Sequence, residues 1–389
     1  MNADHRFSER TGWSREENRI SGVLEDLRLD GRRVLDLSRS NPTACGFRYN
    51  ETQIRRAISA SKVLRYEPDP RGLAVARTAI CGYYEAKGEG LAADDLVLTS
   101  GTSEGYSFLF RLLCNAGDEV LIPSPGYPLF DFLADLCDVK LVRFPLVYDH
   151  GWQIDFAALA AAASERTRAL VVVHPNNPTG HYTSESEQTQ LAEFCRPRGI
   201  ALIADEVFLD FSLVGRRRSF ASAGTLSFTL SGLSKICGLP QMKLAWIAAS
   251  GDDEEKREAL ARLELIADAY LSVGTPVQLA AAALLGTRTA FRAQAVERIR
   301  ANLRELDGQL SRQSACSRLV CEGGWTAVLR VPALESDEDL TIALLKERGV
   351  HVHPGHFYDF PKSGHIVISL IVPEQEFAEG VQRVLVHFA

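Results

Sequence analysis

Short apolar segments alternate with helical segments along the middle of this chain, and this alternation restricts the fold more than any other feature. Most of the apolar segments are hydrophobic on both faces and rich in β-branched residues. Such strands are typical of a largely parallel sheet covered by helices on both sides. Ligands of these sheets bind beyond the carboxyl ends of the strands. The seven expected strands lie at residues 96–99, 120–122, 141–144, 170–173, 202–204, 228–230 and 244–249.

A different pattern begins after the Gly-Thr-Pro segment at residues 274–276. A long alanine- and arginine-rich helical region covers about residues 277–312, and a smaller α+β unit follows it. At 389 residues the chain is long enough for two domains. We expect an N-terminal segment at 1–40 that joins the small domain, a large domain at 41–285 and a small C-terminal domain at 286–389.

Composition and charge exclude several classes of protein. The net charge of −7 gives no basic patch, so nucleic acid is not an expected partner. The eight cysteines include no Cys-x-x-Cys pair, which argues against a metal site and against a disulfide framework. Residues 1–18 lack the apolar core of a signal peptide, and no uncharged run approaches the roughly 18–20 apolar residues of a membrane helix. We therefore expect a cytoplasmic protein without a membrane partner.

Lys235 lies between the last two expected strands, in the segment Leu-Ser-Gly-Leu-Ser-Lys-Ile-Cys-Gly. Burial between strands disfavours the ammonium form of a lysine and lowers its pKa. The neutral amine is a nucleophile that binds carbonyl groups covalently, including that of pyridoxal phosphate (PLP). The alternative is a surface lysine in a loop, which is the usual case for an isolated lysine. Four further segments favour the first interpretation.

Two of these segments could hold an anion and a flat ring. Gly101, Thr102 and Ser103 follow the strand at 96–99 and begin a helix. The free N–H groups and the dipole at a helix start attract anions, although Ser and Thr also cap many helices that bind nothing. Tyr127 lies in Pro-Ser-Pro-Gly-Tyr-Pro, where the prolines hold its ring in one place. It could stack on a cofactor ring, or it could be a packed loop tyrosine.

The other two segments supply an amide and a carboxylate. Asn177 lies in His-Pro-Asn-Asn-Pro-Thr-Gly, and its amide could donate a hydrogen bond to a phenolate oxygen; a plain Asn-Pro turn is the alternative. Asp205 ends the strand at 202–204. A carboxylate at the end of a buried strand needs a cationic partner, which could be a pyridinium nitrogen or an arginine.

Taken together, these segments resemble the fold-type I PLP enzymes of the class I/II aminotransferase family, over nearly the whole chain. The resemblance implies an aspartate aminotransferase-like fold, with a seven-stranded, mostly parallel sheet between helices and a smaller α+β domain. It implies PLP as the cofactor and Lys235 as the residue that binds it covalently and transfers the proton. The implied cofactor contacts are Asp205 to the pyridine nitrogen, Asn177 to the phenolic oxygen, Tyr127 to the ring face, and Gly101, Thr102, Ser103 and Lys243 around the phosphate.

The resemblance also implies a homodimer with shared active sites. Tyr66, in the turn-rich segment at residues 64–72, matches the family tyrosine that reaches the phosphate from the other subunit. Two positions depart from the family pattern. Lys243 stands where arginine is usual, which keeps the charge but loses the two-pronged hydrogen bonding. Phe208 stands where a tyrosine commonly bonds the phenolic oxygen, so we expect a changed pKa of the cofactor-bound Lys235 nitrogen.

A third departure concerns the substrate. Val367 stands where the family has the arginine that binds the substrate α-carboxylate. Either another cation replaces it or the substrate lacks an ordinary α-carboxylate. The candidate cations are Arg39, Lys362, His351, His353 and His356. The three histidines flank a Pro-Gly turn, and we expect His353 or His356 to contact the substrate, with exposed loop histidines as the alternative.

The resulting prediction is a PLP-dependent aminotransferase. It would move an amino group between an amino acid, or an amine, and a 2-oxo acid by a ping-pong mechanism. The alternative is another PLP reaction on the same fold, such as β-elimination, decarboxylation or racemisation, whose odds Val367 raises. A non-enzymatic regulator would need an added DNA-binding module, for which the N-terminal segment is too short.

Overall fold

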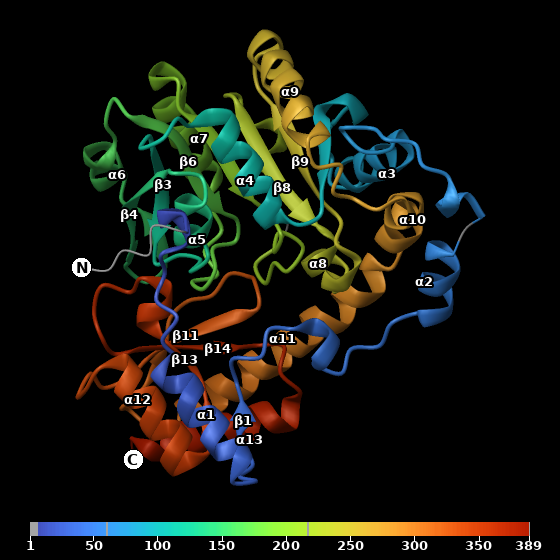
Figure 1. Cartoon of the computed structure of the whole chain (residues 1–389). Coiled ribbons are helices and arrows are strands. Elements are labelled where there is room, and N and C mark those ends of the chain that lie inside the picture. Colours follow the sequence, from blue (N-terminus) through green and yellow to red (C-terminus); the bar gives the residue numbers. More distant parts are fainter. Residues whose placement is uncertain (1–6, 60, 216–217, 389) are drawn as a thin grey trace.

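The computed structural model describes residues 7–59, 61–215 and 218–388, which form two lobes (Figure 1). The upper lobe is built on an eight-stranded sheet in the order β2-β9-β8-β7-β6-β3-β4-β5. Its strands are β2 (Leu96–Thr99), β3 (Glu119–Ser124), β4 (Lys140–Tyr148), β5 (Trp152–Ile154), β6 (Thr167–Val173), β7 (Ala201–Asp205), β8 (Ser227–Gly232) and β9 (Ala245–Ser250).

Parallel pairing joins the five strands from β8 to β4, as the sequence predicts for a doubly covered sheet. At one edge, β9 runs antiparallel to both β8 and β2. The sheet has one strand more than the seven expected. The additional strand is β5, which forms a short antiparallel hairpin with β4 because Trp152 and Ile154 bury their side chains there.

Helices cover both faces of this sheet. Val171 and Ile203 pack with α4 (Thr102–Leu113), α5 (Phe130–Asp135) and α9 (Asp253–Asp268). Their neighbours Leu170 and Leu202 point the other way, toward α6 (Phe156–Ala162) and α7 (Glu185–Cys195). Successive strand residues point to opposite faces, so burial on both sides explains why these strands are apolar throughout. Helices α2 (Glu51–Ile58), α3 (Ala74–Glu85) and α10 (Thr275–Gly286) pack beside the β2 and β9 edge.

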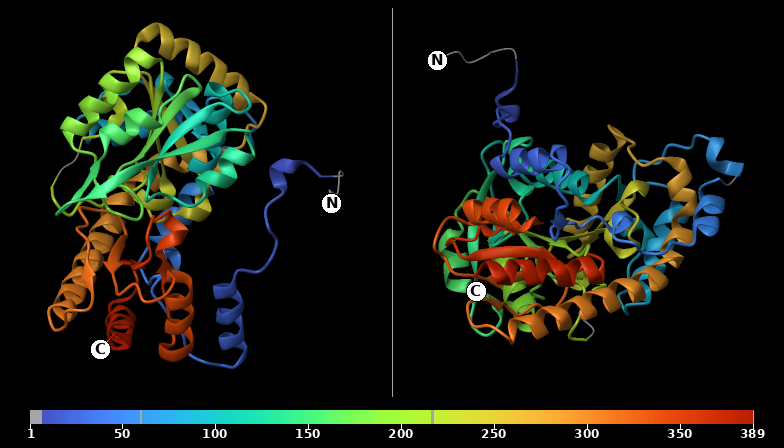
Figure 2. Two further views of the ribbon diagram at one scale, coloured as in Figure 1. Left: turned by 90° about the vertical axis from the view of Figure 1, so that its left-hand side faces the viewer. Right: turned by 90° about the horizontal axis from the view of Figure 1, so that it is seen from below.

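The lower lobe holds a four-stranded antiparallel sheet of β10 (Ser317–Arg318), β11 (Thr326–Arg330), β14 (His365–Ser369) and β13 (His353–Pro354). Around it lie α11 (Arg288–Leu310), α12 (Asp337–Ala343) with a π-helical turn at Leu344–Arg348, and α13 (Glu374–His387). The helical region expected at 277–312 is two helices, α10 and α11. Figures 1 and 2 show α11 running from the upper lobe down along the lower one.

Residues 19–36 of the N-terminal segment lie beside the lower lobe, whereas Arg10 and Trp13 bond to Asp138 and Asp135 of the upper lobe (Figures 1 and 2). Helix α1 (Arg19–Leu29) contacts α12, and β1 (Leu35–Asp36) pairs in parallel with β12 (Val350–His351). The domain boundaries at residues 40 and 285 stay a prediction. In the part of the chain that the structure describes, each helix is too short or too polar to cross a lipid bilayer.

Candidate active site

A cavity of about 310 Å³ lies where the carboxyl ends of the upper-lobe strands face the sheet of the lower lobe. The upper lobe contributes five of the residues singled out from the sequence: Thr102, Tyr127, Asn177, Asp205 and Lys235. The lower lobe contributes residues from β11, β13 and β14 and from the loops beside them. Segments far apart in the sequence therefore meet at this edge, as the rule for parallel sheets predicts.

Lys235 lies in the single-turn helix α8 (Leu233–Ile236), directly after β8. Its Nζ atom lies 5.6 Å from the ring centroid of Phe208 and 5.2 Å from that of Trp325. Burial lowers the pKa of the Lys235 amine, and the charge of Asp205 opposes this effect. The surroundings therefore favour the neutral, nucleophilic form of the amine.

Asp205 ends β7 and has a side chain with few exposed atoms. One carboxylate oxygen accepts a hydrogen bond of 3.1 Å from the backbone N–H of Val207, and the other accepts one of 3.1 Å from the hydroxyl of Tyr106. Burial nevertheless raises the pKa of Asp205 to about 6. A cation placed beside this carboxylate would stabilise its charged form.

Tyr106 is a site residue that the sequence analysis missed. It lies on the apolar face of α4 and is fully buried. A buried tyrosine hydroxyl needs a hydrogen-bond partner, and this requirement was the available signal. The partner itself, 99 residues further along the chain, could not be identified from local sequence.

Asn177 and Tyr127 lie beside these groups in the same cavity. Among the described residues, the Oδ1 atom of Asn177 is buried without a hydrogen-bond partner. Buried polar atoms are seldom left unpaired, so this amide fits a site that a ligand completes. Tyr127 is half-buried, and burial raises the pKa of its hydroxyl to about 12, so the ring stays neutral.

The residues expected to bind the phosphate lie at and beside the start of α4. A Cβ atom on Gly101 would lie 3.4 Å from Nζ of Lys243, so the lysine amine stands directly beside this helix end. Lys243 has a φ of 51°, in the left-handed region. Thr102 lines the cavity, whereas Ser103 is exposed and lies outside the set of lining residues. The helix start and a cation therefore converge as an anion site requires.

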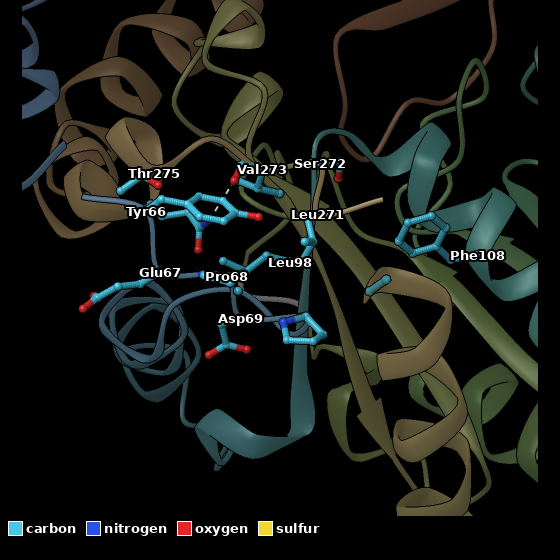
Figure 3. Close-up of a pocket in the computed structure, with 14 residues that line it drawn as sticks. Tyr66, Glu67, Pro68, Asp69, Leu98, Phe108, Leu271, Ser272, Val273 and Thr275 are labelled. Carbon is cyan, nitrogen blue, oxygen red and sulfur yellow. Dashed lines mark hydrogen bonds between the residues drawn. The ribbon is translucent and has the colours of Figure 1, made fainter. Parts of the chain in front are cut away.

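Tyr66 lies away from this cavity. Its side chain is 74% exposed and borders a separate pocket with Leu271, Val273 and Thr275. Figure 3 shows its ring next to Val273 and Thr275. Within one chain, the structure therefore does not bring Tyr66 to Lys235.

Val367 does line the cavity, from the middle of β14. Of the five cations considered as replacements for an arginine, His353 also lines the cavity. Burial and the neighbouring His351 lower the pKa of His353 to about 4, so its ring is neutral near pH 7. Its Nδ1 atom lies 2.8 Å from the hydroxyl oxygen of Tyr358.

The other four candidate cations lie elsewhere. Arg39 is 3.2 Å from a carboxylate oxygen of Glu376, and His351 is 3.3 Å from one of Asp36. His356 and Lys362 border a different cavity, next to α12. Of the two histidines expected to contact the substrate, His353 is therefore in position and His356 is not.

Comparisons with known proteins agree with this arrangement. The profile of the family "Aminotransferase class I and II" matches residues 36–384. The alanine aminotransferase of Mycobacterium tuberculosis is 28% identical over 370 residues, which are 92% of this chain and 86% of that protein. The glutamate-pyruvate aminotransferase AlaA of Haemophilus influenzae is 30% identical over 268 residues, which are 67% of this chain and 66% of that protein.

Solved structures show the same fold. Alanine aminotransferase from Pyrococcus furiosus superposes with a TM-score of 0.90 at 23% identity, covering 98% of this chain and 99% of that chain. Aspartate aminotransferase from Thermus thermophilus superposes with a TM-score of 0.86 at 22% identity, covering 98% and 99%. Nothing in these matches favours elimination, decarboxylation or racemisation. The chain belongs to the class I and II aminotransferases, a family of PLP-dependent enzymes, and it is a transaminase.

Proposed function

We propose that this transaminase binds PLP in the cavity described above, with Lys235 as the residue that attaches it. The proposal is based on one observation: three separate strand ends bring Lys235, Asp205 and Asn177 to the same cavity. When bound, PLP supplies a carbonyl group that links to amines and a protonated ring that accepts electrons.

The residues present fit this cofactor. Asp205 is a buried carboxylate with a raised pKa, and a pyridinium nitrogen would supply its missing cation. The Nδ2–H of the Asn177 amide would donate a hydrogen bond to the phenolic oxygen, and Tyr127 would lie against the ring. Gly101, Thr102 and Ser103 at the helix start, together with Lys243, would hold the phosphate.

In this arrangement Lys235 also moves the proton. With its amine free of the cofactor, Lys235 would stand in the cavity as a base with a lowered pKa. The aromatic rings of Phe208 and Trp325 exclude water around Nζ. The same amine serves both half-reactions of a ping-pong exchange between the amino donor and a 2-oxo acid.

We further propose that two copies of the chain form a homodimer with shared sites. Leu64 is 93% exposed, and the exposed side chains of Tyr66 and Leu271 line the pocket of Figure 3. An exposed apolar surface of this kind is typical of a protein interface. Tyr66 would then reach the phosphate of the partner's cofactor.

A cytoplasmic location and the domain boundaries at 40 and 285 complete the proposal. All eight cysteines are free in the structure, which suits a reducing compartment.

The test of cofactor binding is reduction with borohydride after incubation with PLP. We expect a coloured protein whose absorption changes with an amino donor and returns with a 2-oxo acid. Peptide mapping should find the reduced cofactor on Lys235 and find none in Lys235→Ala. A protein that stays colourless, or a label on another lysine, would contradict the proposal. Sedimentation of wild type and Leu64→Asp tests the dimer, which the variant should weaken.

A further inference from the structure

The wall of the cavity on the lower lobe is formed around Val367. In the sheet, Val367 of β14 is directly opposite Val328 of β11 on one side and His353 of β13 on the other. Directly paired residues point to the same face of a sheet, so the three form one surface. Trp325 and Tyr358 lie beside it along the cavity. Val328 itself does not line the cavity, and Thr326 and Ser369 add hydroxyl groups to its lower-lobe side. A substrate bound at Lys235 therefore meets an uncharged wall in which Val367, Ile368, Trp325 and Tyr358 are the apolar and aromatic members.

This wall offers no charge to an anion. Among the described residues that line the cavity, Lys235 is the one cationic side chain, and Asp205 is an anion. The ring of His353 is neutral at pH values well above 4 and lies within hydrogen-bonding distance of Tyr358.

Two arginines near the cavity, Arg39 and Arg298, are already paired with acids, whereas Lys243 lies at the expected phosphate position beside Gly101. The Arg39 guanidinium turns to Glu376, although its neighbours Ser38 and Ser40 line the cavity. The Arg298 guanidinium lies 3.5 Å from a carboxylate oxygen of Glu374. Neither arginine lines the cavity. A carboxylate at Val367 would lose its hydration without gaining a cationic partner, which is unfavourable.

We propose that the preferred amino donor carries no carboxylate on the carbon that bears the amino group, and that the wall around Val367 binds an uncharged apolar group instead. This inference rests on the proposed role of Lys235, whose amine is then engaged by the cofactor and does not serve as a counter-ion. The substrate class is a primary amine with an alkyl or aryl group. A 2-oxo acid uses the same cavity in turn, so its carboxylate should bind weakly, through hydroxyl donors such as Ser40 and Tyr358.

The first experiment compares matched donors on the PLP-loaded enzyme. The rate of the cofactor absorption change is measured with 2-phenylethylamine and L-phenylalanine, and with isopropylamine and L-alanine. We expect each amine to react roughly tenfold or more faster per unit concentration than its amino acid, because an uncompensated charge costs at least one charged hydrogen bond. Amino acids that react faster than their amines would overturn the inference.

Variants at one position test the assignment of the wall. Val367→Arg should move the preference toward the amino acid by roughly tenfold or more, since arginine pairs with carboxylates in a two-pronged geometry. Val367→Met, which adds length without charge, should leave the preference for amines in place. If the preference between amine and amino acid changed equally in both variants, the size of the side chain at this position, and not its charge, would determine the preference. That result would overturn the inference.

A binding measurement separates this inference from the proposed function. Calorimetric titration of the loaded wild type with 3-phenylpropanol and 3-phenylpropanoate needs no reaction. We expect the neutral alcohol to bind more tightly, and the order to reverse in Val367→Arg. Tighter binding of the carboxylate to wild type would reject the inference. If no donor changes the cofactor absorption, the proposed function fails, while the titration still decides the charge preference of the wall.

Discussion

Replacing Asp205 by asparagine should stabilise the cofactor-free protein while weakening its hold on PLP. The carboxylate is buried, and burial raises its pKa from the ordinary value of 3.8 to about 6. The folded protein therefore binds this proton more tightly than the unfolded chain does. Stability from the protonated carboxyl is complete below pH 3.8 and is lost as the pH rises through 6. Asparagine has nearly the same shape as aspartic acid and does not ionise, so its burial carries no penalty for a charge.

The magnitude follows from the shift. A rise of about two pKa units corresponds to roughly 3 kcal/mol, of which about half is lost by pH 5 and nearly all by pH 7. Urea unfolding of cofactor-free wild type and Asp205→Asn is therefore measured from pH 5 to pH 8. The advantage of the variant should grow by about 1.5 kcal/mol between pH 5 and pH 7. An advantage that does not change with pH would refute the reasoning.

Excess PLP gives the second half of the assay. The cofactor should raise the unfolding midpoint of wild type more than that of Asp205→Asn, because the amide cannot neutralise a pyridinium nitrogen. Glu206→Gln is the matched control. Glu206 is buried outside the cavity lining, its pKa is raised to about 7 by burial, and it accepts hydrogen bonds from Ser219 and the backbone of Phe220. Its variant should also gain stability at high pH, yet respond to PLP as wild type does.

Two further predictions concern residues around the site. Phe208→Tyr adds a hydroxyl near Nζ of Lys235 and should shift the pH midpoint of the bound cofactor's absorption; identical midpoints would remove the role of this position. Burial lowers the pKa of His181, but Glu187 at 3.3 Å and Glu322 at 3.7 Å raise it above 6.5 on balance. His181→Gln should therefore lower the unfolding free energy more at pH 6 than at pH 9, because the stabilisation by the charged ring is lost as the pH rises through its raised pKa. An equal loss at both pH values would contradict this.

The local sequence was sufficient to predict those strands, and the residues at their ends, whose positions follow from residue type alone. Residues 169–173 of β6 and 201–204 of β7 are all apolar and buried, so the existence and the layer of these strands followed from residue type. Asp205 and Asn177 follow the carboxyl ends of such strands, and parallel strands end at one edge of a sheet. Their convergence with Lys235 on one cavity could therefore be predicted before any contact was known.

Contacts between distant segments could not be predicted in this way. The hydroxyl of Tyr106, in α4, donates a hydrogen bond to Asp205 at the end of β7. The hairpin strand β5 forms where Trp152 and Ile154 pack into a cluster of side chains from other elements. The sequence offered five candidate cations in place of an arginine at Val367 and favoured His353 or His356 for contact with the substrate. The packing of the two lobes decided that His353 is the candidate that lines the cavity. The same burial lowers the pKa of its ring, so that the ring is neutral near pH 7.

The amino-acid sequence by itself determined the layered fold and singled out Lys235 and the groups proposed to bind the cofactor, because hydrophobic period and strand-end chemistry are properties of neighbouring residues. The tertiary structure decided the charge of the substrate wall. A side chain's direction and its degree of burial depend on elements hundreds of residues away, and these set whether a nearby cation such as Arg39 faces the cavity or turns to Glu376.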